Sequence, residues 1–157
     1  MLRKIISGGQ TGVDRAALDT SLAHNFPCGG WCPRGRLAED GRILPKYPLR
    51  ETASGEYEAR TELNVQDSNG TLILTWGEPT GGTALTIELT CAHKKPCLIF
   101  DLKKGKGGVI ENILEWIEEN HIEILNVAGP RESKVPGIYE TAKSLLEELL
   151  RRIESKI

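Results

Sequence analysis

The sequence of 157 residues has few aromatic side chains, no long apolar run and no excess of basic residues. Its longest apolar stretches, such as residues 97–100, are far too short to cross a bilayer. The 20 lysines and arginines are balanced by 22 acidic residues, whereas proteins that bind DNA or RNA usually carry a basic excess. Residues 2–6 have the composition of a strand rather than of a signal peptide. We therefore expect a cytoplasmic protein whose partner is neither a membrane nor a nucleic acid.

The four cysteines do not follow the spacing of a structural zinc site. Three residues separate Cys28 from Cys32 and five separate Cys91 from Cys97, whereas structural zinc favours a separation of two. A histidine lies near each pair, so zinc stays open as an alternative. Reduced and mostly buried thiols are the ordinary state of cysteines in the cytoplasm. We therefore expect no metal site.

Short apolar runs alternate with amphipathic stretches along the chain. The pattern predicts strands at residues 4–7, 26–31, 71–76, 96–102 and 122–128, and helices at residues 11–24, 83–93, 108–120 and 137–153. Such alternation is typical of a mainly parallel sheet with helices on both faces. The sequence thus predicts a single α/β domain of Rossmann-like type over residues 1–157. An irregular insertion at about 33–57 is either a flap over a binding site or a solvated excursion.

Three of the predicted strands run into glycine-containing connections, at residues 7–12, 76–83 and 128–133. Glycine lets the backbone approach a ligand, and the helix that follows offers free N–H groups with a partial positive charge. Because ligands of parallel sheets bind beyond the carboxyl ends of the strands, we expect the three connections to form one site for a phosphate or similar anion. Plain structural turns are the alternative. The candidate residues are Gly8, Gly9, Thr11, Gly12, Gly81, Gly82, Thr83 and Gly129.

Arginines are the expected cationic partners of such an anion, because guanidinium groups form bidentate bonds to phosphate. Arg34, Arg36, Arg60 and Arg131 are candidates, of which we expect about half to contact the ligand and the rest to be surface charges. We select Arg34, Arg60 and Arg131 as the binding residues.

The helix expected at residues 83–93 carries two informative side chains. At 100° per residue, Glu88 falls on the apolar, core-facing side, where a carboxylate needs a partner or a route to water. Ile87 points away from that side and is flanked by Thr86 and Thr90, a surface that costs little to desolvate. We therefore expect a homo-oligomer in which this helix meets its own copy.

Several longer motifs resemble the molybdenum carrier family, whose members are similar to the molybdenum cofactor carriers of algae and bacteria. They are SGGQTGVDRAALD, GWCPRGRLAEDG, YPLRET, YEARTELNVQDSNGTLIL and the GGT helix start, and the resemblance extends over essentially the whole chain. The resemblance implies a Rossmann-like fold, dimers or tetramers, and a phosphorylated pterin or nucleotide as ligand. It also implies kinship with the Lonely Guy phosphoribohydrolases, which pair a PGGxGT loop with a glutamate. Here residues 79–83 read PTGGT, with Glu88 as the corresponding glutamate, so both glycine order and spacing differ.

Three functions follow from these observations. The first, which we favour, is a carrier that binds the molybdenum cofactor (molybdopterin) or its pterin precursor through the phosphate, with no catalytic residue. The second is a hydrolase for the N-glycosidic bond of a nucleoside monophosphate, in which Glu88 would act on the sugar or on water. The third is a sensor of a nucleotide-derived ligand.

Overall fold

Five parallel strands form the central sheet of the computed structural model, which describes all 157 residues. Their order in space is β2 (Cys28–Gly29), β1 (Lys4–Ile6), β9 (Ile124–Ala128), β7 (Gly70–Thr75) and β8 (Cys97–Asp101). Every residue of β7 is buried, as a strand covered on both faces requires. The last strand in the sequence, β9, thus lies between the first, β1, and β7.

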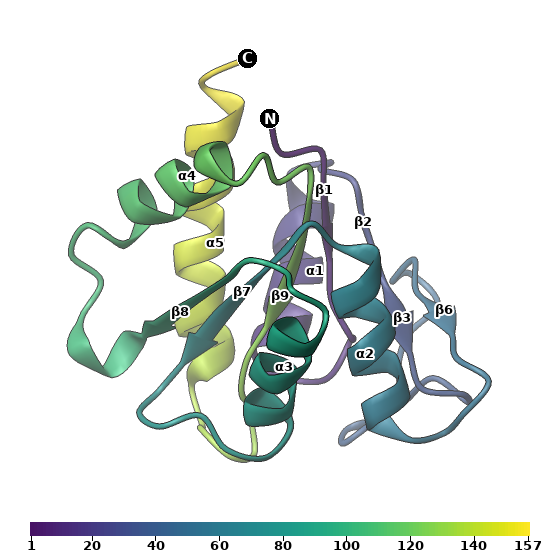
Figure 1. Cartoon of the computed structure of the whole chain (residues 1–157). Helices are drawn as coiled ribbons and strands as arrows, with labels where there is room; N and C mark the ends of the chain where they lie inside the picture. The colour runs from purple at the N-terminus through teal and green to yellow at the C-terminus, as the bar shows by residue number, and fades with distance from the viewer.

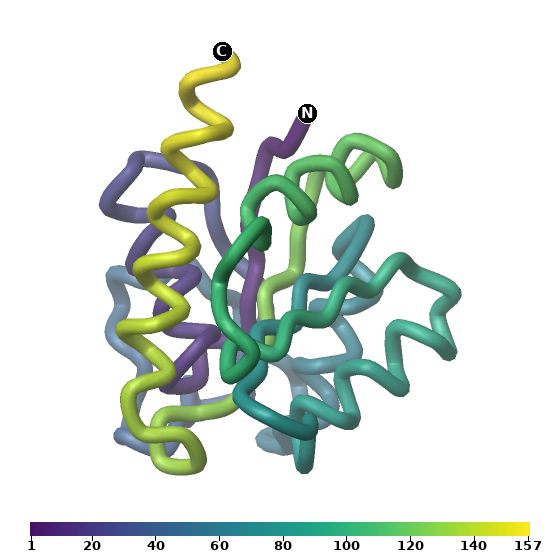
Figure 2. The backbone as a smooth tube through the Cα atoms, turned by 90° about the vertical axis from the view of Figure 1, so that its left-hand side faces the viewer, coloured from purple at the N-terminus to yellow at the C-terminus, as the bar shows by residue number.

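Helices cover both faces of this sheet (Figures 1 and 2). The apolar core of 22 buried residues joins the sheet to α1 (Val13–Ala23), α4 (Val109–Glu119) and α5 (Ile138–Glu154). The other face carries α2 (Tyr57–Asp67) and α3 (Gly81–Ala92), which lie in front of the sheet in Figure 1. The predicted α/β, Rossmann-like fold is confirmed. None of the helices is both long enough and apolar enough to cross a membrane.

Helix α2 was not among the predicted elements. Its buried positions are Arg60, Asn64 and Val65, so two of the three inward-facing side chains are polar. A helix of this kind has no apolar stripe, which is the signal on which sequence-based assignment depends. The first turn of α2 provides one wall of the site described below.

The insertion is an ordered subdomain rather than a solvated excursion. The predicted strand at residues 26–31 is divided between β2 and β3 (Trp31–Cys32), and β3 pairs in parallel with β6 (Arg50–Glu51). Between β3 and β6, β4 (Leu37–Ala38) and β5 (Gly41–Arg42) form a hairpin. This segment and α1 share a small core of their own, made of Leu18, Cys32, Ala38, Ile43, Tyr47 and Leu49.

Arg36 stabilises the insertion from within. Its guanidinium group donates hydrogen bonds to the carbonyl oxygens of Ile43, Leu44, Tyr47 and Leu49, at 2.8–3.1 Å. Four of its five N–H donors are therefore engaged by backbone carbonyls. Arg36, one of the candidate anion clamps, does not line the pocket described below.

The orientation of α3 is also a correction. Thr86 and Thr90 are buried, whereas Glu88 is exposed and Ile87 is only partly so. A threonine face can be buried because each hydroxyl donates to a carbonyl of its own helix, Thr86 to Gly82 and Thr90 to Ile87, at 2.8 and 2.7 Å. The placement of Glu88 on the core-facing side is wrong, whereas the homo-oligomer expected through Ile87 stays a prediction.

Replacement of Arg36 by lysine tests its fastening role. Lysine keeps the charge but cannot reach four carbonyl groups at once, so we expect Arg36→Lys to lower the local stability of residues 36–49 by about 2 kcal/mol. Hydrogen exchange of that segment should accelerate, while exchange in β7 and β9 stays unchanged. Arg34→Lys is the matched control, because Arg34 is exposed. Equal protection in the two variants would contradict this role.

Candidate functional site

A pocket of about 560 Å³ opens where β1, β9 and β7 end, between the first turns of α2 and α3. All three glycine-containing connections contribute to its wall, because parallel strands end at the same edge of their sheet. Seven of the predicted site residues line it, namely Gly8, Arg60, Gly81, Gly82, Thr83, Gly129 and Arg131. Gly9, Thr11, Gly12 and Arg34 do not.

The first turn of α3 presents unsatisfied backbone donors to this pocket. Thr80 precedes the helix without a side-chain cap, and the N–H groups of Gly81 and Gly82 make no hydrogen bond within the protein. The N–H of Thr83 is already bonded to the Thr80 carbonyl at 3.1 Å, so Thr83 offers less than the sequence led us to expect. Free N–H groups at a helix start attract anions.

A lysine reinforces the positive potential at this helix start. The amino group of Lys134 lies over Gly81, so close that a Cβ on Gly81 would be 2.5 Å from it. No carboxylate forms a salt bridge with Lys134. A cation held beside the positive end of a helix is electrostatically unfavourable unless an anion joins them. Gly81 also needs to be glycine because its φ is +53°.

Glycines of the pocket serve different purposes. A Cβ at Gly82 would meet no protein atom within 4 Å, so the open space beside Gly82 is available to a ligand. A Cβ at Gly129 would lie 2.2 Å from the carbonyl oxygen of Leu74, and one at Gly8 would strike the Arg60 side chain. Close packing of the chain is thus sufficient to require glycine at positions 129 and 8, without a ligand.

The remaining predicted residues hold the loops in place. A Cβ at Gly9 would collide with Leu49 in the core of the insertion, and one at Gly12 with the Pro130 carbonyl. The Thr11 hydroxyl donates to the Glu39 carboxylate and accepts the N–H of Glu132 at 3.2 Å. These three residues position the pocket from behind rather than lining it.

Glu39, on the hairpin of the insertion, connects two of the pocket's loops. Its carboxylate accepts the hydroxyl and the N–H of Ser133, at 2.5 and 3.1 Å, and lies 3.4 Å from Nε of Arg131. Partial burial disfavours the charged form of Glu39, but the hydrogen bonds from the hydroxyls of Ser133 and Thr11, with others, outweigh it and lower the pKa of this carboxylate. Arg131, a predicted anion clamp, therefore already has a carboxylate neighbour.

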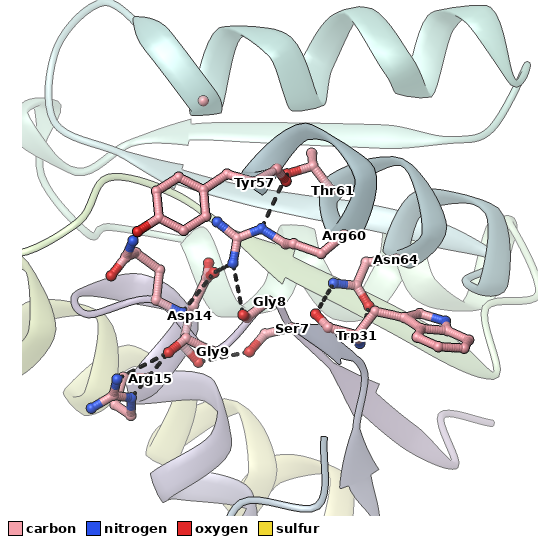
Figure 3. A network of polar contacts seen from close by, with 12 residues as sticks. Ser7, Gly8, Gly9, Asp14, Arg15, Trp31, Tyr57, Arg60, Thr61 and Asn64 are labelled. Carbon is pink, nitrogen blue, oxygen red and sulfur yellow. Dashed lines mark hydrogen bonds and ion pairs between the residues drawn. The ribbon is translucent and has the colours of Figure 1, made fainter. Parts of the chain in front are cut away.

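A buried arginine and a buried carboxyl group form the opposite end of the pocket (Figure 3). Arg60 reaches from α2 to the β1–α1 connection, where its Nη1 donates to the Gly8 carbonyl at 2.7 Å. The Tyr57 ring covers the guanidinium, 5.2 Å from its central carbon. Asp14, in the first turn of α1, has Oδ2 3.9 Å from Arg60 Nη1 and accepts the Gln10 N–H at 3.3 Å.

The environment of Asp14 changes its acidity. Burial raises the pKa of the Asp14 carboxyl to about 6 from 3.8, because removal from water disfavours the charged form. The positive charge of Arg60 and the backbone N–H of Gln10 lower the pKa, but they do not outweigh burial. A carboxyl group kept under such conditions beside a cavity is typical of functional sites.

Sequence reasoning missed several residues of this pocket. Asp14 lies two residues after Gly12, on a helix whose buried positions are mostly apolar, and an acid on that face is a signal that could have been used. Asn64 belongs to the helix that was not predicted, and it ties α2 to the insertion by bonds to the Trp31 N–H and carbonyl, at 2.8 and 3.0 Å. Lys134 gives no signal in the sequence beyond its position after the last glycine connection.

The four cysteines lie away from the pocket. Burial raises the pKa of the Cys28, Cys32 and Cys97 thiols, which favours their protonated form. No group of three or more His, Cys, Asp or Glu side chains is arranged to hold a metal ion.

Comparison with known proteins gives two matches. Residues 5–150 match the model of the circularly permutated YpsA SLOG family. A crystal structure from Syntrophus aciditrophicus SB, named "Putative molybdenum carrier protein", is 49% identical to the chain, covers 95% of each chain and superposes with a TM-score of 0.93. No curated protein sequence matches the chain.

The pKa of Asp14 predicts how stability depends on pH. A carboxyl with a higher pKa in the folded state binds its proton more tightly there, so the free energy of unfolding falls as pH rises from 3.8 towards 6. Asp14→Asn removes this loss but keeps an oxygen for the Gln10 N–H. We expect the variant to be more stable than the parent by up to about 3 kcal/mol at pH 8 and similar to it at pH 4.

Urea unfolding at a series of pH values measures this difference. Glu115→Gln, which removes an exposed carboxylate from α4, is the control and should follow the parent. If the free energy of unfolding depends on pH in the same way in Asp14→Asn and in the parent, ionisation of Asp14 does not destabilise the folded state.

Proposed function

The chain belongs to the circularly permutated YpsA SLOG family, and we propose that it binds a small molecule that carries a phosphate group. The observation that carries this proposal is the start of α3, where the N–H groups of Gly81 and Gly82 and the amino group of Lys134 converge on the pocket without an anionic partner. A phosphate group would satisfy all three. The phosphate would lie at the carboxyl edge of the sheet, beside the end of β7.

The similar Syntrophus protein is named as a molybdenum carrier, which supports our proposal that the cargo of this chain is the molybdenum cofactor. That cargo is a pterin with one terminal phosphate, and a pocket of about 560 Å³ has the size of ordinary small-molecule sites. Because no cysteine lines the pocket, the protein would hold such a cargo by its phosphate and pterin atoms and not by a thiolate bond to the metal. A carrier that binds its cargo without catalysing a reaction needs no general acid or base beside the metal.

The hydrolase alternative loses the residue on which it was based. Glu88 is exposed on α3 and does not line the pocket, so it cannot reach a sugar bound there. Asp14 is the buried carboxyl group of the pocket, and its position next to Arg60 suits recognition of a ligand as well as acid–base chemistry. We therefore favour the binding protein.

Replacement of Gly82 tests the phosphate site directly. The added methyl group of Gly82→Ala meets no protein atom, so the fold is retained, and alanine is favourable within a helix. It would nevertheless occupy the space of the phosphate. We expect the affinity for pyrophosphate to fall at least about tenfold while the melting temperature stays the same or rises.

Titrations with pyrophosphate followed by amide NMR and calorimetry measure both effects. In the parent protein the largest shifts should fall on the N–H groups of Gly81 and Gly82. Gly107→Ala is the matched control, because its Cβ also meets no atom within 4 Å and Gly107 lies outside the pocket. Unchanged affinity in Gly82→Ala would refute the site.

The cargo itself can be identified on gently purified protein. Mass spectrometry of the retained small molecules should detect a phosphorylated pterin in the parent protein and much less of it in Gly82→Ala. A retained compound without phosphate, equally abundant in both, would contradict the proposed function.

A further inference from the structure

The pocket has a second polar end, which the phosphate would not occupy. Arg60 and Asp14 lie beside the end of β1, whereas Gly81 and Gly82 follow β7, and β9 separates the two strands. Two strand spacings place these ends about 10 Å apart. A small molecule with its phosphate on α3 would therefore bring a different group against Arg60 and Asp14.

Arg60 and Asp14 retain unused hydrogen-bonding capacity. Each residue is only 8% exposed. A bound ligand that displaces the remaining water would therefore become the main hydrogen-bond partner of their free atoms. Nε and Nη1 of Arg60 are engaged with Thr61 and Gly8, whereas Nη2 makes no hydrogen bond. The Asp14 carboxylate has about four acceptor positions, of which the Gln10 N–H takes one on Oδ2. A free donor and a free acceptor thus lie near each other, because Nη1 of the same guanidinium is 3.9 Å from Asp14 Oδ2.

The complement of an adjacent donor and acceptor is an N–H group next to a carbonyl oxygen. In a heterocycle this is a lactam edge, whose oxygen would accept from the guanidinium and whose N–H would donate to the carboxylate. An edge with the reverse order, a ring nitrogen lone pair next to an amino group, would set its lone pair against the carboxylate and its N–H groups against the guanidinium. When the bound phosphate fixes the orientation of the ring, the pair therefore discriminates between the two kinds of ring.

We propose that Arg60 and Asp14 select ligands whose ring carries a lactam edge, so that the pocket takes phosphorylated oxo-heterocycles such as pterins and oxopurines and rejects aminopurines. This inference rests on the proposed phosphate site and names the other half of its ligand. Pterins and oxopurines share the recognised edge, and the size of the ring and its distance from the phosphate decide between them.

Two nucleotides provide a matched pair of ligands. Inosine monophosphate has the lactam edge, and adenosine monophosphate differs from it only in having the reverse edge. We expect calorimetry to show that the parent protein binds the inosine nucleotide at least about tenfold more tightly. 6-Hydroxymethylpterin phosphate, with the same edge, should also bind, and its affinity relative to that of the inosine nucleotide identifies the preferred ring.

Two variants assign the preference to the pair. Asp14→Asn should bring the two nucleotide affinities to within about threefold of each other, because an amide can donate as well as accept. Arg60→Lys keeps the charge but not the planar guanidinium, so it should also reduce the preference for the inosine nucleotide. This second variant tests the inference even if Asp14→Asn does not fold. Gly82→Ala should weaken both nucleotides equally and leave their ratio unchanged.

The outcomes separate the two proposals. Equal affinities in the parent protein, or tighter binding of the adenosine nucleotide, would overturn the lactam inference while the phosphate site stands. A preference that survives in both Asp14→Asn and Arg60→Lys would also overturn it. If neither nucleotide nor pyrophosphate binds the parent protein, the phosphate site itself is wrong and the inference falls with it.

Discussion

The pairing of β9 between β1 and β7 is the constraint on which the candidate site depends. Leu125 of β9 is in register with Ile5 of β1 on one side and with Gly70 of β7 on the other. Because all three strands are parallel, the connections that leave them start at the same edge. Segments more than 100 residues apart in the chain, around Gly8 and Gly129, become neighbours in this way. The connections must then approach each other closely. A Cβ on Gly12 or Gly129 would accordingly lie only 2.3 or 2.2 Å from a backbone carbonyl oxygen.

A buried charged pair is retained at this edge although an apolar pair would cost the fold less. Burial of a charge is unfavourable unless the lost hydration is replaced, and the raised pKa of Asp14 shows that its replacement is incomplete. Arg60 is better compensated, by the Gly8 carbonyl and the Tyr57 ring. Proteins commonly hold such unfavourable groups where a ligand completes their hydrogen bonding. The polar helix α2 has the same explanation, because its inward face supplies Arg60 to the pocket instead of apolar contacts to the core.

The sequence predicts the fold well and the site in part, for a physical reason. Apolar periodicity identifies the strands β7 and β9 and the helices α4 and α5, because those elements owe their stability to apolar burial. It also identifies the edge strand β8, of which Leu98 and Phe100 are partly buried against the same core. The same criterion fails for α2, whose buried residues are polar, and reverses α3, whose buried face is threonine. Glycine connections predict the edge at which the pocket opens, but they do not distinguish Gly82, which faces open space, from Gly129, which is tightly packed. That difference depends on β7 and α1, which no local pattern at residue 129 encodes.

In the proposed mode of binding, the charges of the pocket also favour one direction for the ligand. At the α3 end, the helix start and Lys134 are both positive and have no carboxylate partner. At the β1 end, the positive charge of Arg60 is offset by Asp14, which is mostly ionised at neutral pH since its pKa is about 6. Arg131, between them, is offset by Glu39. A phosphate dianion would be attracted to α3 and repelled by the Asp14 carboxylate, so a phosphorylated ligand has one favourable orientation, with its uncharged ring towards β1.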